Sequence, residues 1–143
     1  MSSIWRTIPD LQTVNEQFNK DTICEHLDIR LTEIGDDYLK GTMPADKRTF
    51  QTYGVVHGGA NVVLAETLGS FAGAMLIDTE RFQCFGQEVS ASHLRPVSEG
   101  LVTGTARPIH LGRRSHVWEI HLENDKGKLT CVSKLTLAIV AIE

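Results

Sequence analysis

One stretch of the chain constrains the fold more than any other. Residues 60 to 77 follow His57-Gly58-Gly59 and contain no turn residue except Gly69 and Gly73. Their apolar side chains recur at helical spacing: Ala60, Val63, Leu64, Leu68, Phe71, Ala72, Met75 and Leu76. This pattern predicts one long helix that is apolar almost all round and therefore buried. Each interior glycine costs about 1 kcal/mol relative to alanine, so we expect another backbone to pack closely against them.

Segments with strand character surround this helix. Two precede it, near 27–34 and 38–43, and four follow it, near 84–95, 100–111, 114–124 and 128–141. The short separators carry turn residues, which favours hairpins. The order predicts an α+β fold in which a mostly antiparallel sheet wraps the helix, in a single domain over 1–143. A short amphipathic helix, capped by Thr7 and reaching Phe18, is expected near the start.

Charge and cysteine content narrow the classes of partner and compartment. The net charge is −4, from 14 basic and 18 acidic residues, so the molecule as a whole does not attract nucleic acid or anionic membranes. Its three cysteines show no paired spacing, which is typical of reduced thiols. No apolar run resembles a signal peptide or a membrane helix. We therefore expect a cytoplasmic protein without a membrane partner.

The predicted buried helix contains an acidic residue, Glu66, whose neighbours are apolar. An isolated charge is costly in such surroundings. One interpretation is a general base or nucleophile that faces a cleft. The alternative is a narrow polar face or a buried cation as its partner. Ser70, one helical turn later, shares the face of Glu66 and either orients the carboxylate or merely fits a crowded helix.

The helix start is a second candidate for chemistry. The first N–H groups of a helix are unpaired and lie at its positive end, and Gly58 and Gly59 have no side chain to obstruct an approaching carbonyl oxygen. This arrangement is typical of an oxyanion hole, although a glycine-rich turn before a helix is an equally simple reading. Gly58 and Glu66 are eight positions apart, about 12 Å along a helix. Both can serve one carbonyl only if two chains pack their helices antiparallel.

Other motifs either are missing from the sequence or stay ambiguous. The six histidines lack zinc-like spacing, and no Walker loop, dinucleotide fingerprint or Gly-x-Ser-x-Gly elbow occurs. His57 is the best functional histidine because it adjoins the helix start. Several basic residues lie near strand ends, where they either bind phosphates or form a solvated surface. They are His93, Arg95, Arg107, Arg113 and Arg114.

Two segments resemble the hotdog-fold thioesterases. They are Gln51-Thr52-Tyr53-Gly54-Val55-Val56-His57-Gly58-Gly59-Ala60 and Leu64-Ala65-Glu66-Thr67-Leu68-Gly69-Ser70. Within the family, the likeness is strongest to the group of 1,4-dihydroxy-2-naphthoyl-CoA thioesterases and enterobactin-pathway proofreading thioesterases. These relatives commonly carry Gln-Pro-Phe-Gly where this chain has Gln51-Thr52-Tyr53-Gly54, so a tyrosine hydroxyl near the acyl pocket is expected to alter which acyl group fits.

The resemblance implies a role for each matching position. Glu66 is implied as nucleophile or general base, the Gly58 N–H as oxyanion donor and Gln51 as a substrate contact, with His57 and Ser70 in support. It also implies a coenzyme A channel along Gly86, His93, Leu94, Arg95, Pro96, His110, Leu111, Gly112, Arg113, Arg114 and Ser115. The family pairs subunits into a continuous sheet with shared active sites and usually joins two dimers into a homotetramer.

The resemblance implies hydrolysis of an aromatic or medium-chain acyl-CoA to a free acid and CoA, and we expect no metal or other cofactor. Two alternatives remain open at this point. One is a dehydratase on the same fold that uses His57 and Glu66 as an acid–base pair. The other is a non-catalytic module that binds acyl-CoA or an acyl carrier protein. An acyl carrier protein is also a possible source of the acyl group for the hydrolase.

Overall fold

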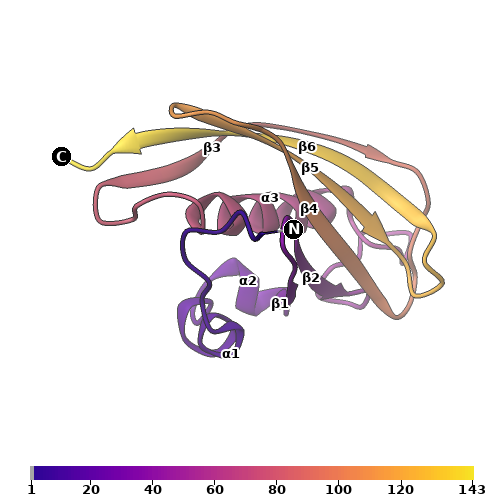
Figure 1. The fold of residues 1–143 in the computed structure, drawn as a ribbon. Coiled ribbons are helices and arrows are strands. Elements are labelled where there is room, and N and C mark those ends of the chain that lie inside the picture. The colour runs from indigo at the N-terminus through magenta and orange to yellow at the C-terminus, as the bar shows by residue number, and fades with distance from the viewer. Residues whose placement is uncertain (1) are drawn as a thin grey trace.

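Six antiparallel strands form one sheet that curls around a single long helix (Figure 1). The computed structural model describes residues 2–143. The strand order is β1-β2-β4-β5-β6-β3. The elements that make up this unit are β1 (Arg30–Ile34), β2 (Leu39–Pro44), α3 (Gly58–Ala74), β3 (Phe82–His93), β4 (Leu101–Leu111), β5 (Ser115–Glu123) and β6 (Leu129–Ala141). The expected α+β order is confirmed.

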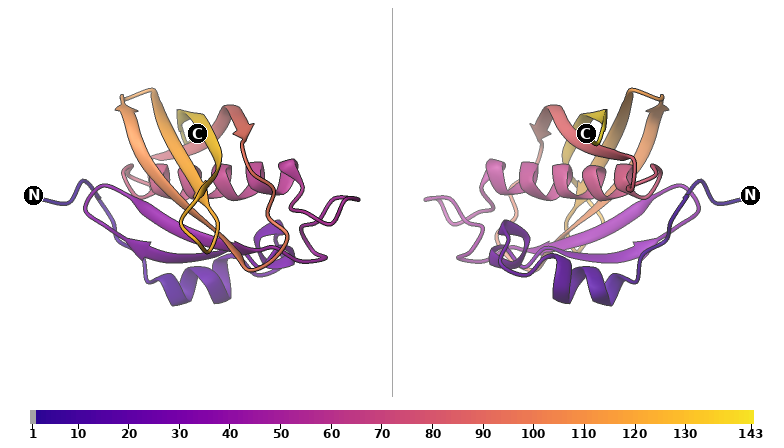
Figure 2. Two further views of the ribbon diagram at one scale, coloured as in Figure 1. Left: turned by 90° about the vertical axis from the view of Figure 1, so that its right-hand side faces the viewer. Right: turned by 90° about the vertical axis from the view of Figure 1, so that its left-hand side faces the viewer.

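Viewed from the two ends, the sheet bends around α3, with β1 and β2 on one side and β3, β5 and β6 on the other (Figure 2). Bulges interrupt the ladders of β1–β2, β3–β6 and β4–β5, and a bulge increases local bend and twist. Among the described helices, none has the length and apolar character that a bilayer crossing requires.

The sheet pairing differs from the expected hairpins at one place. Strands β1–β2, β4–β5 and β5–β6 do pair with their sequence neighbours, but β3 pairs with β6 and not with β4. The separator at 94–100 therefore does not close a hairpin. It carries the chain from β3, at one edge of the sheet, to β4 in its middle. The pairing with β6 places β3 along α3 and at the edge of the sheet, so one side of its backbone is unpaired within the chain.

In the core, leucines of α3 pack against the sheet at positions where the strands have glycine. Leu64 and Leu68 are fully buried. A Cβ on Gly104 of β4 would lie 2.6 Å from Leu68 Cδ1 and 2.8 Å from Leu122 Cδ2, and one on Gly41 of β2 would lie 2.7 Å from Leu68 Cδ2. Glycine at these two strand positions thus allows the helix to approach the sheet closely.

The glycines within α3 have a different neighbour from the one we expected. The Cβ positions of Gly69 and Gly73 point at the ends of Leu135 and Leu137 on β6. Side chains, and not another backbone, therefore approach these glycines. The helix is also shorter than expected, because it ends at Ala74. It is not buried all round: one face is covered by the sheet, while Val62, Val63, Glu66, Ser70, Phe71 and Ala74 are only half-buried.

The N-terminal segment begins its helix later than expected. Thr7 is not its N-cap. The N–H groups of Arg6 and Thr7 both donate to Met75 O at 3.0 Å, and these bonds hold this part of the chain beside the end of α3. Asp10 is the cap, and its carboxylate accepts from the Thr13 N–H. The segment contains α1 (Leu11–Thr13), a π-helical turn η1 (Val14–Phe18) and α2 (Ile23–His26), the last of which the sequence did not indicate.

The close approach of α3 to the sheet predicts the effect of adding one methyl group. Gly104→Ala should lower the free energy of unfolding by about 1–3 kcal/mol, because Leu68 and Leu122 are fully buried and have little room to move. Urea unfolding measures the change, with Thr105→Ala on the same strand as the control. Unchanged stability of Gly104→Ala would show that the leucines are not tightly packed there.

Candidate active site

The Glu66 side chain meets β3 at Gly86. A Cβ on Gly86 would overlap the Glu66 carboxylate, so the absence of a side chain makes room for the acid. The β3–β6 ladder is irregular here, because its register shifts between Gly86 and Glu88, and bulges are frequent beside active sites. Glu66 forms no ion pair within residues 2–143. The alternative of a buried cation as its partner is therefore not realised in this part of the protein.

The start of α3 presents a free backbone donor. His57 is the N-cap, and its Nδ1 accepts from the Gly59 N–H at 2.8 Å. No acceptor within the described chain pairs with the Gly58 N–H, as expected for the first residue of a helix. The His93 ring, at the end of β3, lies against Gly58: a Cβ on Gly58 would be 2.8 Å from His93 Nε2. One face of this helix start is thus formed by an imidazole.

The carboxylate and the free N–H lie at separate positions on one rigid element. Gly58 and Glu66 both belong to α3, and their eight-residue separation corresponds to about 12 Å. Each has its own neighbour on β3, Gly86 for Glu66 and His93 for Gly58. A single chain therefore does not bring the two groups to one carbonyl.

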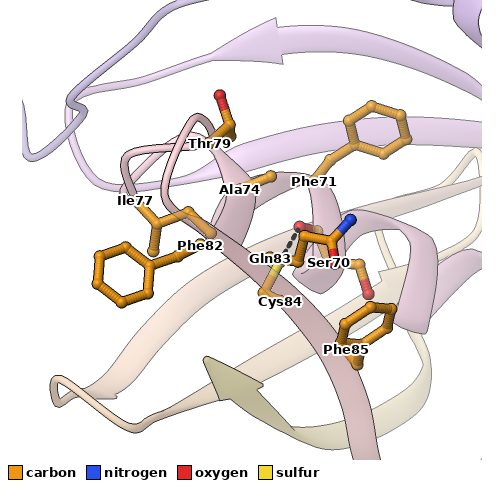
Figure 3. Close-up of a pocket in the computed structure, with 9 residues that line it drawn as sticks. All are labelled: Ser70, Phe71, Ala74, Ile77, Thr79, Phe82, Gln83, Cys84 and Phe85. Carbon is orange, nitrogen blue, oxygen red and sulfur yellow. Dashed lines mark hydrogen bonds between the residues drawn. The ribbon is translucent and has the colours of Figure 1, made fainter. Parts of the chain in front are cut away.

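An apolar cavity of about 420 Å³ opens one helical turn beyond Glu66 (Figure 3). Ser70 contributes a hydroxyl to its lining, and Phe71, Phe82 and Phe85 supply aromatic walls. Small-molecule sites usually combine such an apolar lining with a few polar groups. The cavity has the size and the lining for an apolar group of a small molecule.

Cys84 also lines this cavity, and its thiol donates to Ser70 O at 3.5 Å. Burial raises the pKa of the Cys84 thiol. It therefore remains protonated at neutral pH and is a poor nucleophile, since the thiolate is the reactive form. Glu66 is the group in this region with the charge and position for nucleophilic or general-base chemistry.

Gln51 lies in the loop before α3, and its side chain is turned toward its own loop. Its Oε1 accepts from the Tyr53 N–H, while its backbone N–H donates to Val55 O at 2.9 Å. Tyr53 is 89% exposed. The structure does not bring Gln51 into contact with Glu66 within one chain, and its expected substrate contact stays a prediction.

Gly86, one of the expected coenzyme A residues, lies against Glu66 in the middle of α3. The others separate into two sets at opposite ends of this helix. His93 lies at the first residues of the helix, and Leu94, Arg95 and Pro96 follow it on the surface. The second set forms the β4–β5 turn, where the Gly112 N–H donates to Ser115 O at 2.9 Å. Part of that turn lines a cavity beyond the other end of α3. A helix of 17 residues spans about 25 Å, so one chain does not hold both sets around one ligand.

The second cavity, of about 480 Å³, is basic. Arg6, Arg81 and Arg113 line it together with Asp78, which pairs with Arg6 at 3.5 Å. His116 also lines it but is buried, and burial, assisted by nearby His110, lowers the pKa of its imidazole. The positive charge of this cavity at neutral pH therefore comes from its arginines.

Several residues of these sites were not singled out in the sequence. The aromatic walls Phe82 and Phe85 belong to a strand whose place beside α3 depends on long-range pairing. One signal was available: Phe82, Cys84 and Gly86 alternate on β3, so a strand along the helix would present them to the face that carries Glu66. Arg6 and Arg81 gave no comparable signal, because isolated surface arginines are common.

Comparisons with known proteins identify the family of the chain. A family model for the Thioesterase superfamily matches residues 53–131. The proofreading thioesterase EntH of Cronobacter turicensis is 46% identical, over 96% of this chain and 98% of its own. The 1,4-dihydroxy-2-naphthoyl-CoA hydrolase of Escherichia coli is 44% identical, over 96% and 99% respectively.

The solved structures extend the likeness to the fold. A crystal structure of a mutant thioesterase from Pseudomonas aeruginosa superimposes with a TM-score of 0.96 at 47% identity, covering 98% of this chain and 100% of that one. The expected hotdog architecture, in which an antiparallel sheet wraps one long helix, is confirmed. Together, the family match and the near-complete relatives show that the chain belongs to the thioesterase superfamily and is a thioester hydrolase.

Proposed function

We propose that this protein hydrolyses acyl-CoA thioesters at a site built from Glu66 of one chain and the Gly58 N–H of a partner chain. The observation that carries the proposal is the Glu66 carboxylate, which lies against Gly86 without an ion-pair partner in the described chain and one turn from the aromatic cavity. A carboxylate in this position is free to attack a carbonyl or to activate water.

The reaction follows one of two balanced routes. In the first, Glu66 attacks the thioester carbonyl carbon, the C–S bond breaks, CoA leaves as its thiolate, and water then hydrolyses the enzyme-bound anhydride. In the second, Glu66 takes a proton from water, which attacks the carbonyl directly. In both, the Gly58 N–H stabilises the negative charge on the carbonyl oxygen. A thiolate leaves readily, so neither route requires a metal or redox cofactor.

Two observations favour a site shared between chains. The first is the separation of about 12 Å between Gly58 and Glu66 on α3. The second is the division of the expected coenzyme A residues between the two ends of the same helix. Antiparallel packing of two copies of α3, with the first half of one beside the first half of the other, brings Gly58 next to the partner's Glu66, and Glu66 next to the partner's Gly58.

Strand β3 offers a surface for such pairing. It is 12 residues long and lies at the sheet edge, so one side of its backbone is unpaired within the chain. An exposed edge strand of this length is a template for another strand. Pairing of β3 with its copy about a two-fold axis would continue the sheet and close the aromatic cavity. Association of two such dimers into a homotetramer is our further expectation.

The cavity favours an aromatic or medium-chain acyl group, since three phenylalanines line it. Two relatives are named for a naphthoyl-CoA substrate and for proofreading, and both names suit a cytoplasmic enzyme that receives its acyl group from CoA or from an acyl carrier protein. The dehydratase alternative has less support, because His57 Nδ1 is occupied by its helix-capping bond. The binding-module alternative predicts tight binding without turnover.

Glu66→Ala should lower kcat on the best acyl-CoA by about 10³-fold, because it removes the group that attacks or activates water. Thiol release from benzoyl-, hydroxynaphthoyl- and C4–C16 acyl-CoAs measures turnover and ranks the substrates. Glu80→Ala, an exposed acid in the α3–β3 connection, is the control. Turnover that survives Glu66→Ala would contradict the assignment.

A shared site predicts that two inactive variants complement each other. Gly58→Pro removes the N–H at the first helical position, where the backbone tolerates proline, and its ring also displaces the His93 imidazole. Glu66→Ala removes the carboxylate of the other half-site. In a random mixture, half of the dimers contain both variants and one of their two sites is intact, so about a quarter of wild-type activity should return. Subunit exchange is verified by native mass spectrometry. No recovery after proven exchange would rule out the shared site.

The basic cavity predicts a selective effect on coenzyme A. Arg113→Glu should raise KM for acyl-CoA by about ten-fold with little change in kcat, because it removes a charged hydrogen bond to a phosphate. KM for the corresponding acyl-N-acetylcysteamine, which lacks the nucleotide, should stay the same. Arg30→Glu, at an exposed site on β1, is the control. Equal effects on both thioesters would place Arg113 away from the nucleotide.

A further inference from the structure

The first turn of α3 contains a buried amide that the proposed mechanism does not use. Asn61 is 5% exposed, and its Nδ2 lies 3.3 Å from His93 Nδ1. Its Oδ1 is inaccessible and has no partner among residues 2–143. Leaving a buried polar atom unpaired costs about 1–3 kcal/mol, so an apolar residue would be less costly here. Compared with an apolar residue at this position, the amide group of Asn61 adds one interaction, its contact with His93.

This contact determines where the proton of the neutral His93 ring lies. With the Asn61 amide oriented so that its NH₂ faces the ring, Nδ1 is the acceptor and the proton of the neutral ring is on Nε2. The bond therefore selects the Nε2–H tautomer of the neutral ring, and it also fixes the orientation of the ring.

Of the His93 ring atoms, Nε2 lies nearest to the position that a Cβ on Gly58 would take. A Cβ on Gly58 would lie 2.8 Å from His93 Nε2, compared with 3.2 Å from Cε1 and 3.3 Å from Cδ2. The Gly58 N–H has no acceptor within the described chain. Two donors, one from the backbone and one from an imidazole, are thus neighbours at the positive end of α3.

We infer that Asn61 is a positioning residue that holds His93 as an Nε2–H donor beside Gly58, so that the imidazole and the backbone N–H together bind the thioester carbonyl oxygen. The inference rests on the proposed function for the identity of the ligand. The tautomer of His93 is independent of that function. Asn61 acts through His93 and does not contact the substrate.

The test combines nitrogen NMR of the His93 ring at pH 8 with kinetics on the best acyl-CoA. In the wild type, Nε2 should carry the proton and Nδ1 should show the shift of a hydrogen-bonded acceptor. Asn61→Leu keeps the side-chain volume but removes the donor. It should release the ring into a mixture of tautomers and lower kcat roughly ten-fold, with KM changed less than about two-fold.

A double-mutant cycle separates positioning from simple stability. His93→Ala removes one oxyanion donor and should lower kcat about 10²-fold. Asn61→Leu combined with His93→Ala should be no slower than His93→Ala alone, because Asn61 acts only through the ring. Asn19→Leu is the matched control. Asn19 is buried like Asn61 and has one unpaired amide atom, its Nδ2, but it lies in the N-terminal segment. Its His93 spectrum and kcat should match those of the wild type.

Three results would overturn the inference. One is a wild-type His93 with its proton on Nδ1, which would mean that Asn61 presents its oxygen to the ring. Another is a double variant whose loss equals the product of the two single losses, since Asn61 would then act independently of His93. The third is an unchanged His93 spectrum in Asn61→Leu. If the wild type turns over no thioester, the proposed function fails while the spectrum still decides the tautomer.

Discussion

The hydrogen-bonded ladder of α3 sets the spacing on which the rest of the site depends. Because a helix rises 1.5 Å per residue, the eight residues between Gly58 and Glu66 cannot be shortened by a change of side-chain conformation. The cavity next to Ser70, the imidazole of His93 and the basic cavity beyond Ala74 are all placed relative to this rigid element. In the proposed site, a single helix therefore supplies one half of each of two sites, and this spacing is the physical reason for proposing a dimer.

Glycine allows the sheet to approach this helix where chemistry or packing needs contact. Gly41 and Gly104 admit Leu68 into the sheet, while Gly86 admits the Glu66 carboxylate. In the first case the gain is tight burial of apolar area, and in the second it is a position for a charged group between helix and strand. A glycine in a strand therefore serves stability at Gly41 and Gly104, and the proposed function at Gly86.

The sequence predicted those parts of the structure that depend on local pattern. The spacing of apolar residues indicated α3 and the six strands, and an acid among apolar neighbours indicated Glu66. Long-range pairing was not available from the pattern: β3 joins β6, and this decides which residues face Glu66. Two further errors have the same kind of cause, a contact between residues distant in sequence. Thr7 and Asp10 are both good caps, and only the bonds from Arg6 and Thr7 to Met75 decide between them. Gly69 and Gly73 indicated close packing but not that leucine side chains provide it.

The most direct test is a crystal structure with an acyl-CoA analogue in which a methylene replaces the thioester sulfur. The analogue keeps the carbonyl but cannot release a thiol. We predict its oxygen within about 3 Å of the Gly58 nitrogen of one chain, and its carbonyl carbon beside the Glu66 carboxylate of the other, with the acyl group between Phe71 and Phe82. A carbonyl that contacts Gly58 and Glu66 of the same chain, or that lies away from Glu66 altogether, would contradict the account.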